Sequence, residues 1–170
     1  MNFLELAKER YSVRKFKNNE VELDKLEKIL RAAQLSPTAC NFQPQRLLIL
    51  NTTESLNKLK ECTPYHFDAP LVILVCYDKT VSWKRKYDGH DSGEVDASIV
   101  TTQMMLEIAE LGLGSTWVGS FNPEMVKTLY NLPENFIPVS ILPIGYPDTE
   151  PNSPHNMRLE LNKIVFYNSF

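Results

Sequence analysis

The chain has 170 residues, of which 43% are hydrophobic and 23% charged, a composition typical of one globular domain and unlike that of disordered proteins. Its 18 basic and 21 acidic residues give a net charge of -3, which provides no general attraction for a polyanion, so we expect no nucleic-acid partner. The longest apolar run, Ala69–Tyr77, is too short for a transmembrane helix, and charged residues interrupt the first ten positions, unlike a signal peptide. We therefore expect a soluble, cytoplasmic protein without a membrane partner.

The cysteines and histidines do not form a recognisable metal or disulfide pattern. The cysteines are odd in number and lack a C-x-x-C spacing, which favours reduced thiols. The histidines are spaced unlike any metal set, and a lone histidine is more often a surface residue than a ligand. We therefore expect no metal site and assign no catalytic role to Cys40, Cys62, Cys76, His66, His90 or His155.

The N-terminal half is predicted to contain helices and short apolar strands. Asn2 and Glu5 form a capping pair for the first helix, and apolar residues at three-and-four spacing predict a second helix that Ser36-Pro37 ends. A polar loop follows at 37–45. The predicted elements are helices at 2–10, 22–34 and 54–62 and buried strands at 47–50 and 71–77.

The C-terminal half contains the longest predicted helix, at 94–111, which is apolar nearly all round and should be the central buried helix of the fold. The polar loop before it, at 79–93, is long for a compact domain and is a candidate for function or mobility. Beyond the helix we expect a strand at 116–118, a helix opened by Asn122-Pro123-Glu124, and a last strand at 138–144.

The last segment, 146–170, is rich in proline and polar residues and cannot form a core of its own. It ends in the apolar run Ile164–Tyr167, which something else must cover. We find no internal repeat, so we expect one α+β domain over residues 1–170, with 146–170 as an extended C-terminal arm.

The first candidate binding segment is Arg10–Phe16. In an extended chain the side chains of Arg10, Ser12 and Arg14 point one way, because the side-chain period of a strand is two. Two guanidinium groups and a hydroxyl then offer good donors to a phosphomonoester. A solvated basic surface at a helix end is an equally good interpretation of these residues alone.

Two further segments have the chemistry of a cofactor site. Ser36–Gln45 is rich in amides and hydroxyls, which hydrogen-bond polyols and heterocycle edges, although such a composition is more often an ordinary turn. Gly112–Phe121 is not a dinucleotide fingerprint, because its glycines follow a helix and precede a strand. Gly119, however, allows a flat ligand to approach the backbone, with an N–H available for a ring nitrogen.

Together these segments resemble the nitroreductase family of flavin enzymes over nearly the whole chain. The matching motifs are R-Y-S-V-R-K-F from Arg10, S-P-T-A-C-N-F-Q-P from Ser36, D-A-S-I-V from Asp96, L-G-L-G-S-T-W-V-G-S-F from Leu111 and L-P-I-G-Y-P from Leu142. The resemblance implies an α+β fold with a central, mostly antiparallel sheet flanked by helices. It also implies a homodimer with FMN at the subunit interface and C-terminal arms exchanged between partners.

The resemblance further implies roles for individual residues. Arg10 and Ser12 match positions that bind the FMN phosphate, and Arg14 matches a position that reaches the pyrimidine side of the ring. Pro37, Thr38, Asn41 and Gln43 match the loop contributed across the interface. Gly119 and Ser120 match the turn that faces flavin N5, and Arg158 matches a basic segment that supplies a third phosphate contact.

This chain also departs from the family pattern. Gln45 stands where many relatives have tryptophan, and the chain is shorter than members that insert helices over the flavin. The pocket is therefore expected to be more open, with the Trp83–Gly89 loop, Phe42 and Phe121 as its walls. Surface or interface packing is the alternative interpretation of these aromatic residues.

The implied function is an FMN-dependent oxidoreductase that transfers hydride from NADH or NADPH through flavin N5 to a small acceptor, such as a nitroaromatic or a quinone. A fixed cation near the pyrimidine ring and a backbone donor at N5 fit this chemistry, so no catalytic side chain is expected. The alternatives are a flavin-binding module for storage or sensing, and a relative that reacts with oxygen or performs reductive dehalogenation.

Overall fold

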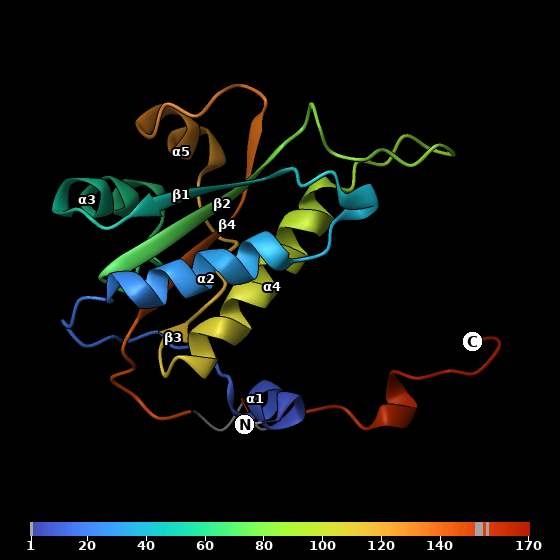
Figure 1. The fold of residues 1–170 in the computed structure, drawn as a ribbon, viewed down its shortest axis with the longest axis horizontal. Coiled ribbons are helices and arrows are strands. Elements are labelled where there is room, and N and C mark those ends of the chain that lie inside the picture. Colours follow the sequence, from blue (N-terminus) through green and yellow to red (C-terminus); the bar gives the residue numbers. More distant parts are fainter. Residues whose placement is uncertain (1, 152–154, 156) are drawn as a thin grey trace.

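The computed structural model, which describes residues 2–151, 155 and 157–170, contains a four-stranded antiparallel sheet of order β1-β2-β4-β3 with helices on both faces (Figure 1). The strands are β1 (Gln45–Leu50), β2 (Leu71–Asp78), β3 (Gly114–Ser115) and β4 (Phe136–Gly145). The helices are α1 (Phe3–Glu9), α2 (Leu23–Leu35), α3 (Thr53–Cys62), α4 (Gly93–Glu110) and α5 (Pro123–Leu129). This architecture confirms the predicted α+β class with a central antiparallel sheet.

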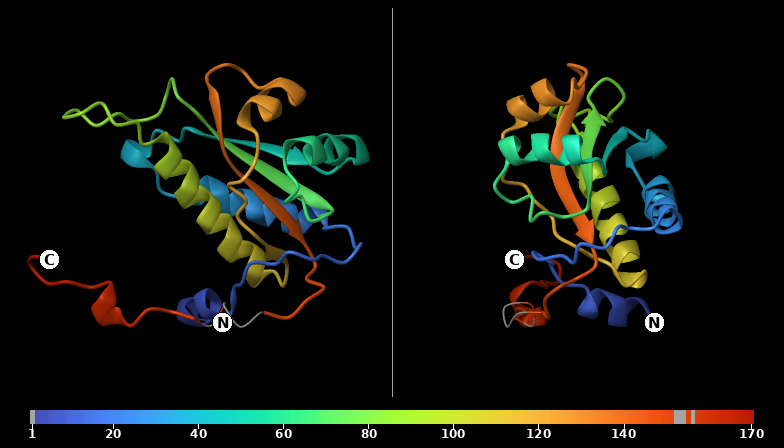
Figure 2. Two further views of the ribbon diagram at one scale, coloured as in Figure 1. Left: turned by 180° about the vertical axis from the view of Figure 1, so that it is seen from behind. Right: turned by 90° about the vertical axis from the view of Figure 1, so that its left-hand side faces the viewer.

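Alternation along the strands divides the core into two layers. In β2, Ile73 and Val75 pack towards α2 and α4, whereas Val72 and Leu74 pack towards α3 and α5. The right-hand view of Figure 2 shows the sheet edge-on between these two helix pairs. Both faces of β2 are buried, which explains its uninterrupted apolar sequence.

Local signals set several element boundaries as predicted. The Asn2 side chain accepts the Glu5 N–H and the Glu5 carboxylate accepts the Asn2 N–H, so a capping box begins α1. Helix α2 ends at Ser36, directly before Pro37. The Asn122 side chain accepts the Met125 N–H at the start of α5.

Helix α4 is the predicted central helix, and it packs against all four strands and against α1 and α2. Its buried residues include Ala97, Val100 and Met104, each without exposed surface. Its outer face keeps Val95 and Ile99 exposed. None of the described helices is long and apolar enough to cross a membrane.

The predicted strand at 116–118 is wrong, because β3 lies earlier, at Gly114–Ser115. Gly114 pairs with Gly145 of β4 and packs so closely on Val13 that an added Cβ would lie 2.4 Å from a Val13 methyl carbon. Val118 returns to β4 only as an isolated bridge to Ile141. The residues Thr116–Val118 have a high strand propensity, which is why the sequence predicts a strand there. Strand formation also requires a paired neighbour, and the continuous pairing with β4 is made by Gly114 and Ser115 instead.

The described part of the C-terminal segment is largely extended, as predicted, and includes the short 3-10 helix η3 (Leu161–Lys163). Its start is held to the N-terminal region, where the Tyr11 hydroxyl donates to the Thr149 carbonyl and the His155 ring lies 2.9 Å from the Lys8 carbonyl oxygen. Residues 152–154 and 156 of the arm lie outside the described residues. Beyond Met157 the arm leads away from the body of the molecule (Figures 1 and 2).

Candidate functional site

The segment after α1 runs beside β3 in an extended conformation. Ser12 forms a parallel bridge with Ser115, and the Val13 N–H donates to the Ser115 carbonyl at 3.0 Å. Val13 is buried, at 1% exposure, while Arg14 is exposed. The expected alternation holds for Val13 and Arg14, whereas Arg10 lines a hollow together with Tyr11 and Val13.

Arg14 lies beside the glycine-containing segment that follows β3. A cavity of about 140 Å³ is lined by Arg14, Tyr65, Phe67 and residues 116–120. Gly119 and Ser120 are exposed, and neither backbone N–H has an acceptor within the described part of the chain. One hollow thus combines a cation with two available backbone donors, the groups that bind an electron-rich heterocycle edge.

Arg10 and Arg158 come together from opposite ends of the chain. Burial, and after it the positive charge of Arg158, lower the pKa of Arg10. Arg158 donates to the carbonyls of His155 and Met157, which fixes it near the arm's attachment to α1. Neither guanidinium forms an ion pair with a carboxylate in the described part of the chain, and two such groups near each other are suited to an anion.

The predicted residues Pro37, Thr38, Asn41 and Gln43 lie on the loop that contains the short 3-10 helix η1 (Ala39–Asn41), which we call the η1 loop. The Thr38 hydroxyl accepts the Gln43 N–H at 3.1 Å, and the Gln43 side-chain amide donates to the Asn41 carbonyl at 3.2 Å. Asn41 and Gln43 have φ values of 54° and 51°, which are uncommon for residues other than glycine. Pro37, Asn41 and Gln43 are exposed on this loop.

The two groups of predicted residues lie at opposite ends of α4 (Figure 1). The η1 loop is bound to the first turn of α4, where the Asp96 carboxylate accepts the Ala39 N–H at 2.9 Å. The Arg14 cavity adjoins the segment that follows the other end of α4 through β3. Helix α4 has 18 residues and is about 27 Å long, so the η1 loop and β3 lie far apart.

The aromatic residues predicted as pocket walls are spread over three places. Phe42 is 51% exposed on the η1 loop. Trp83 is half-buried at the base of a hairpin, where its carbonyl accepts the Ser92 N–H. Phe121 packs partly against the core beneath α3 and α5. None of the three lines the Arg14 cavity within the described residues.

Sequence reasoning missed Tyr65 and Phe67, which form the second wall of that cavity. Their rings are 6.2 Å apart, and Tyr65 is 46% exposed. The signal available was T-P-Y-H-F directly after α3, a helix stop followed by paired aromatics. Phe67 and Asp68 have positive φ values, so the segment turns back in a way that no strand or helix period predicts.

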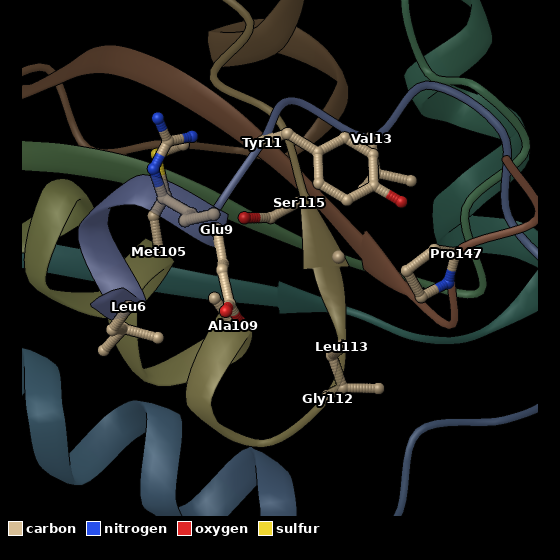
Figure 3. A pocket seen from close by; sticks show the side chains of 12 residues that line it. Leu6, Glu9, Tyr11, Val13, Met105, Ala109, Gly112, Leu113, Ser115 and Pro147 are labelled. Atoms are coloured by element: carbon tan, nitrogen blue, oxygen red, sulfur yellow. The ribbon is translucent and has the colours of Figure 1, made fainter. Parts of the chain in front are cut away.

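A second hollow, of about 200 Å³, lies on the Tyr11 and Val13 side of the N-terminal segment. Figure 3 shows Leu6 of α1 and Met105 and Ala109 of α4 on one side of it, opposite Tyr11, Val13 and Pro147. Its lining is mainly apolar but includes the charged residues Glu9 and Arg10, whereas Ser12 and Arg14 do not line it. It is therefore separate from the Arg14 cavity.

The described residues contain no group of three or more His, Cys, Asp or Glu side chains that could hold a metal ion. Burial raises the pKa of Cys76 to about 12, so this thiol stays protonated and unreactive at neutral pH. Cys62 is also buried, whereas Cys40 is exposed on η1.

Known proteins of one family share the sequence pattern and the fold of this chain. The sequence model of the Nitroreductase family matches residues 7–64 and 64–146. A Methanothermobacter thermautotrophicus protein with the provisional name NADH dehydrogenase/NAD(P)H nitroreductase is 34% identical over 160 residues, covering 90% of this chain and 81% of its own. The crystal structure of a nitroreductase family protein from Clostridium difficile 630 superposes with a TM-score of 0.95, at 46% identity over 100% of both chains. An FMN-dependent nitroreductase from Clostridium difficile R20291 has a TM-score of 0.84 at 30% identity, covering 99% of this chain and 100% of its own.

Proposed function

The chain belongs to the nitroreductase family, and from this premise we propose that it is an FMN-dependent oxidoreductase that transfers hydride from NADH or NADPH to a small acceptor. A similar structure is named an FMN-dependent nitroreductase, and a similar sequence is named for NAD(P)H. For the acceptor we propose a small, flat molecule such as a nitroaromatic or a quinone.

The observation that carries this proposal is the juxtaposition of Arg14 with the free N–H groups of Gly119 and Ser120 around one hollow. An isoalloxazine ring has acceptor atoms along its pyrimidine edge and at N5, and these protein groups are all donors. The Tyr65 and Phe67 rings supply an apolar side wall. The residues present therefore fit this cofactor.

When bound, FMN supplies the atom that accepts and returns hydride, so the chain need not supply an acid or a base. Arg14 places a fixed positive charge where negative charge develops on reduction. The Gly119 and Ser120 N–H groups orient the ring. Arg10, Ser12 and Arg158 hold the phosphate, a doubly charged group that suits paired guanidinium donors.

We further propose that the site is completed by a second copy of the chain. The Arg14 cavity, at about 140 Å³, is smaller than the roughly 300 to 1,000 Å³ of typical cofactor pockets. Pro37, Thr38, Asn41 and Gln43 lie on the loop bound to the first turn of α4 and do not line this cavity, so we assign them to the flavin site of a partner. A homodimer also covers the arm, whose exposed apolar residues are Met157, Leu159, Leu161, Ile164, Val165, Phe166, Tyr167 and Phe170.

The acceptor pocket is proposed to be shared in the same way. Phe42 on η1 and Trp83 at the base of the hairpin both lie near the first turn of α4, where Ser92 donates to Asp96. If the η1 loop completes the flavin site of a partner, Phe42 and Trp83 also lie next to that partner's site. At each site, Phe121 comes from the same chain as Arg14, because Phe121 directly follows Ser120, which lines the Arg14 cavity.

The test is reconstitution followed by anaerobic reduction. Purified protein stripped of cofactor is loaded with FMN, and its visible spectrum is followed after mixing with NADH or NADPH. We expect a yellow holoprotein that bleaches with a nicotinamide and recovers its colour when a quinone is added. Protein that takes up no FMN contradicts the proposal. Loading without reduction on the timescale of seconds instead favours a storage or sensing module.

A further inference from the structure

We propose that Thr63 is a positioning residue whose single hydroxyl joins the two walls of the Arg14 cavity, the proposed flavin site. This inference rests on the proposed function. Thr63 directly follows α3 and is 2% exposed, and it does not line the Arg14 cavity itself. Its backbone N–H is used in the helix cap, where it donates to the Leu59 carbonyl at 3.2 Å.

The Thr63 hydroxyl has one partner in each wall. It donates to the Ser120 carbonyl at 2.7 Å, across 57 residues of sequence, and it accepts the Tyr65 N–H at 3.1 Å. Ser120 belongs to the turn with the free N–H groups, and Tyr65 belongs to the aromatic wall. The Thr63 hydroxyl therefore fixes the Ser120 carbonyl, next to the N–H donors of Gly119 and Ser120. It also fixes the backbone of Tyr65, at the start of the segment that carries the two aromatic rings.

A neighbouring backbone contact also joins these two segments, but it reaches neither Ser120 nor Tyr65. Asn122 donates to the Cys62 carbonyl at 2.9 Å, which holds the segment after the turn to the end of α3. Pro64 has no N–H, so it supplies no donor in place of the hydroxyl. Removal of the hydroxyl leaves the Ser120 carbonyl and the Tyr65 N–H without their partner in a part-buried place, where unpaired polar groups are unfavourable.

The test compares Thr63→Val, which keeps the shape and loses the hydroxyl, with Thr63→Ser, which keeps the hydroxyl. We expect T63V to bind FMN about tenfold more weakly in a titration of cofactor-free protein. Its bound flavin should show altered visible absorption and circular dichroism, and its reduction by nicotinamide should slow by about 10- to 100-fold. T63S should restore all of these to within about twofold of wild type, as a hydrogen-bond role requires.

The matched control is Thr52→Val, which removes a threonine hydroxyl from the other end of the same helix. Thr52 caps α3 by accepting the Ser55 N–H and contacts neither wall. T52V should lower the melting temperature and leave the flavin spectrum and the reduction rate unchanged. Should T63V fail to fold, Thr63→Ala replaces it, because it adds no atoms, and the same changes are expected.

The outcomes separate this inference from the function on which it rests. Wild-type protein that loads FMN, together with T63V or T63A that matches its affinity, spectrum and reduction rate, overturns the role of Thr63 alone. A T63S variant that behaves like T63V also overturns the proposed role of Thr63, because a hydroxyl at this position would then not restore FMN binding. Wild-type protein that takes up no FMN overturns the proposed function and this role with it.

Discussion

At the residue scale, strand alternation predicts the segment Arg10–Arg14 only in part. Buried Val13 and exposed Arg14 follow it, whereas Arg10 lines a hollow with Tyr11 and Val13 because the chain is only leaving α1 at that point. Tyr65 and Phe67 were not predictable in this way. Their position depends on backbone with positive φ at Phe67 and Asp68, which residues other than glycine adopt only when their surroundings impose it.

Arg10→Ala should weaken FMN binding, because it removes a charge-assisted contact to the proposed phosphate position. Such contacts are worth about 1.5 to 3 kcal/mol, which corresponds to a rise in Kd of roughly 10- to 150-fold. Fluorescence titration of cofactor-free protein measures the change. Arg31→Ala on α2, where the guanidinium contacts Gln34, is the control for loss of positive charge. Equal affinities for the two variants would argue against the phosphate assignment.

Asp78 should make stability depend on pH in the acid range. Hydrogen bonds from Thr80 and Asn135, together with the charge of Arg46, lower the pKa of Asp78 from 3.8 to about 2. A carboxylate whose pKa is lower in the folded state stabilises the protein above about pH 4, and this contribution is lost as the pH falls towards 2.

Asp78→Asn should therefore melt at a lower temperature than wild type near pH 5, and the difference should shrink by pH 2. Thermal denaturation followed by circular dichroism at several pH values measures this. A difference in melting temperature that stays constant from pH 5 to pH 2 would show that the Asp78 charge is not responsible.

At the element scale, caps and proline positions predicted most boundaries, because each depends on contacts within one turn of chain. The capping box of α1, the end of α2 before Pro37 and the Asn122 cap of α5 are of this kind. The error at 116–118 is of another kind. Strand identity there depends on pairing between Gly114 and Gly145, which are far apart in the sequence.

The placement of the η1 loop depends on one buried carboxylate. Asp96 is 2% exposed, and its two oxygens accept the Ala39 N–H and the Ser92 hydroxyl. Asp96→Ala leaves the Ala39 N–H unpaired, so we expect a loss of about 1 to 3 kcal/mol in the free energy of unfolding, measured by urea denaturation. We also expect weaker FMN binding, since the loop that reaches the partner is released.

Asp96→Asn is the matched control, because an amide oxygen can still accept the Ala39 N–H and the amide nitrogen can donate to Ser92. It should retain most of the stability and cofactor affinity. An Asp96→Ala chain that binds FMN as tightly as wild type would show that the η1 loop contributes nothing to the site.

At the scale of the whole molecule, the sequence motifs predicted a set of site residues but not how that set is distributed over the fold. Arg14 and Gly119 adjoin one cavity, while Thr38 and Asn41 lie at the other end of α4, and only the three-dimensional structure shows this separation. The exposed apolar arm was predictable as a segment that needs cover. What covers it depends on assembly, which a single chain does not determine.

The central claim, that each flavin site combines Arg10 and Arg14 of one chain with Thr38 and Asn41 of another, is tested most directly by mixing defective chains. One chain carries Arg10→Ala and Arg14→Ala, the other carries Thr38→Ala and Asn41→Ala, and each bears a different affinity tag. Each variant alone should bind little FMN. Mixed dimers purified through both tags should regain one FMN per dimer, because one of their two sites is assembled entirely from unaltered residues. Mixed dimers that contain no FMN would show that both groups of residues act within a single chain and would contradict the claim.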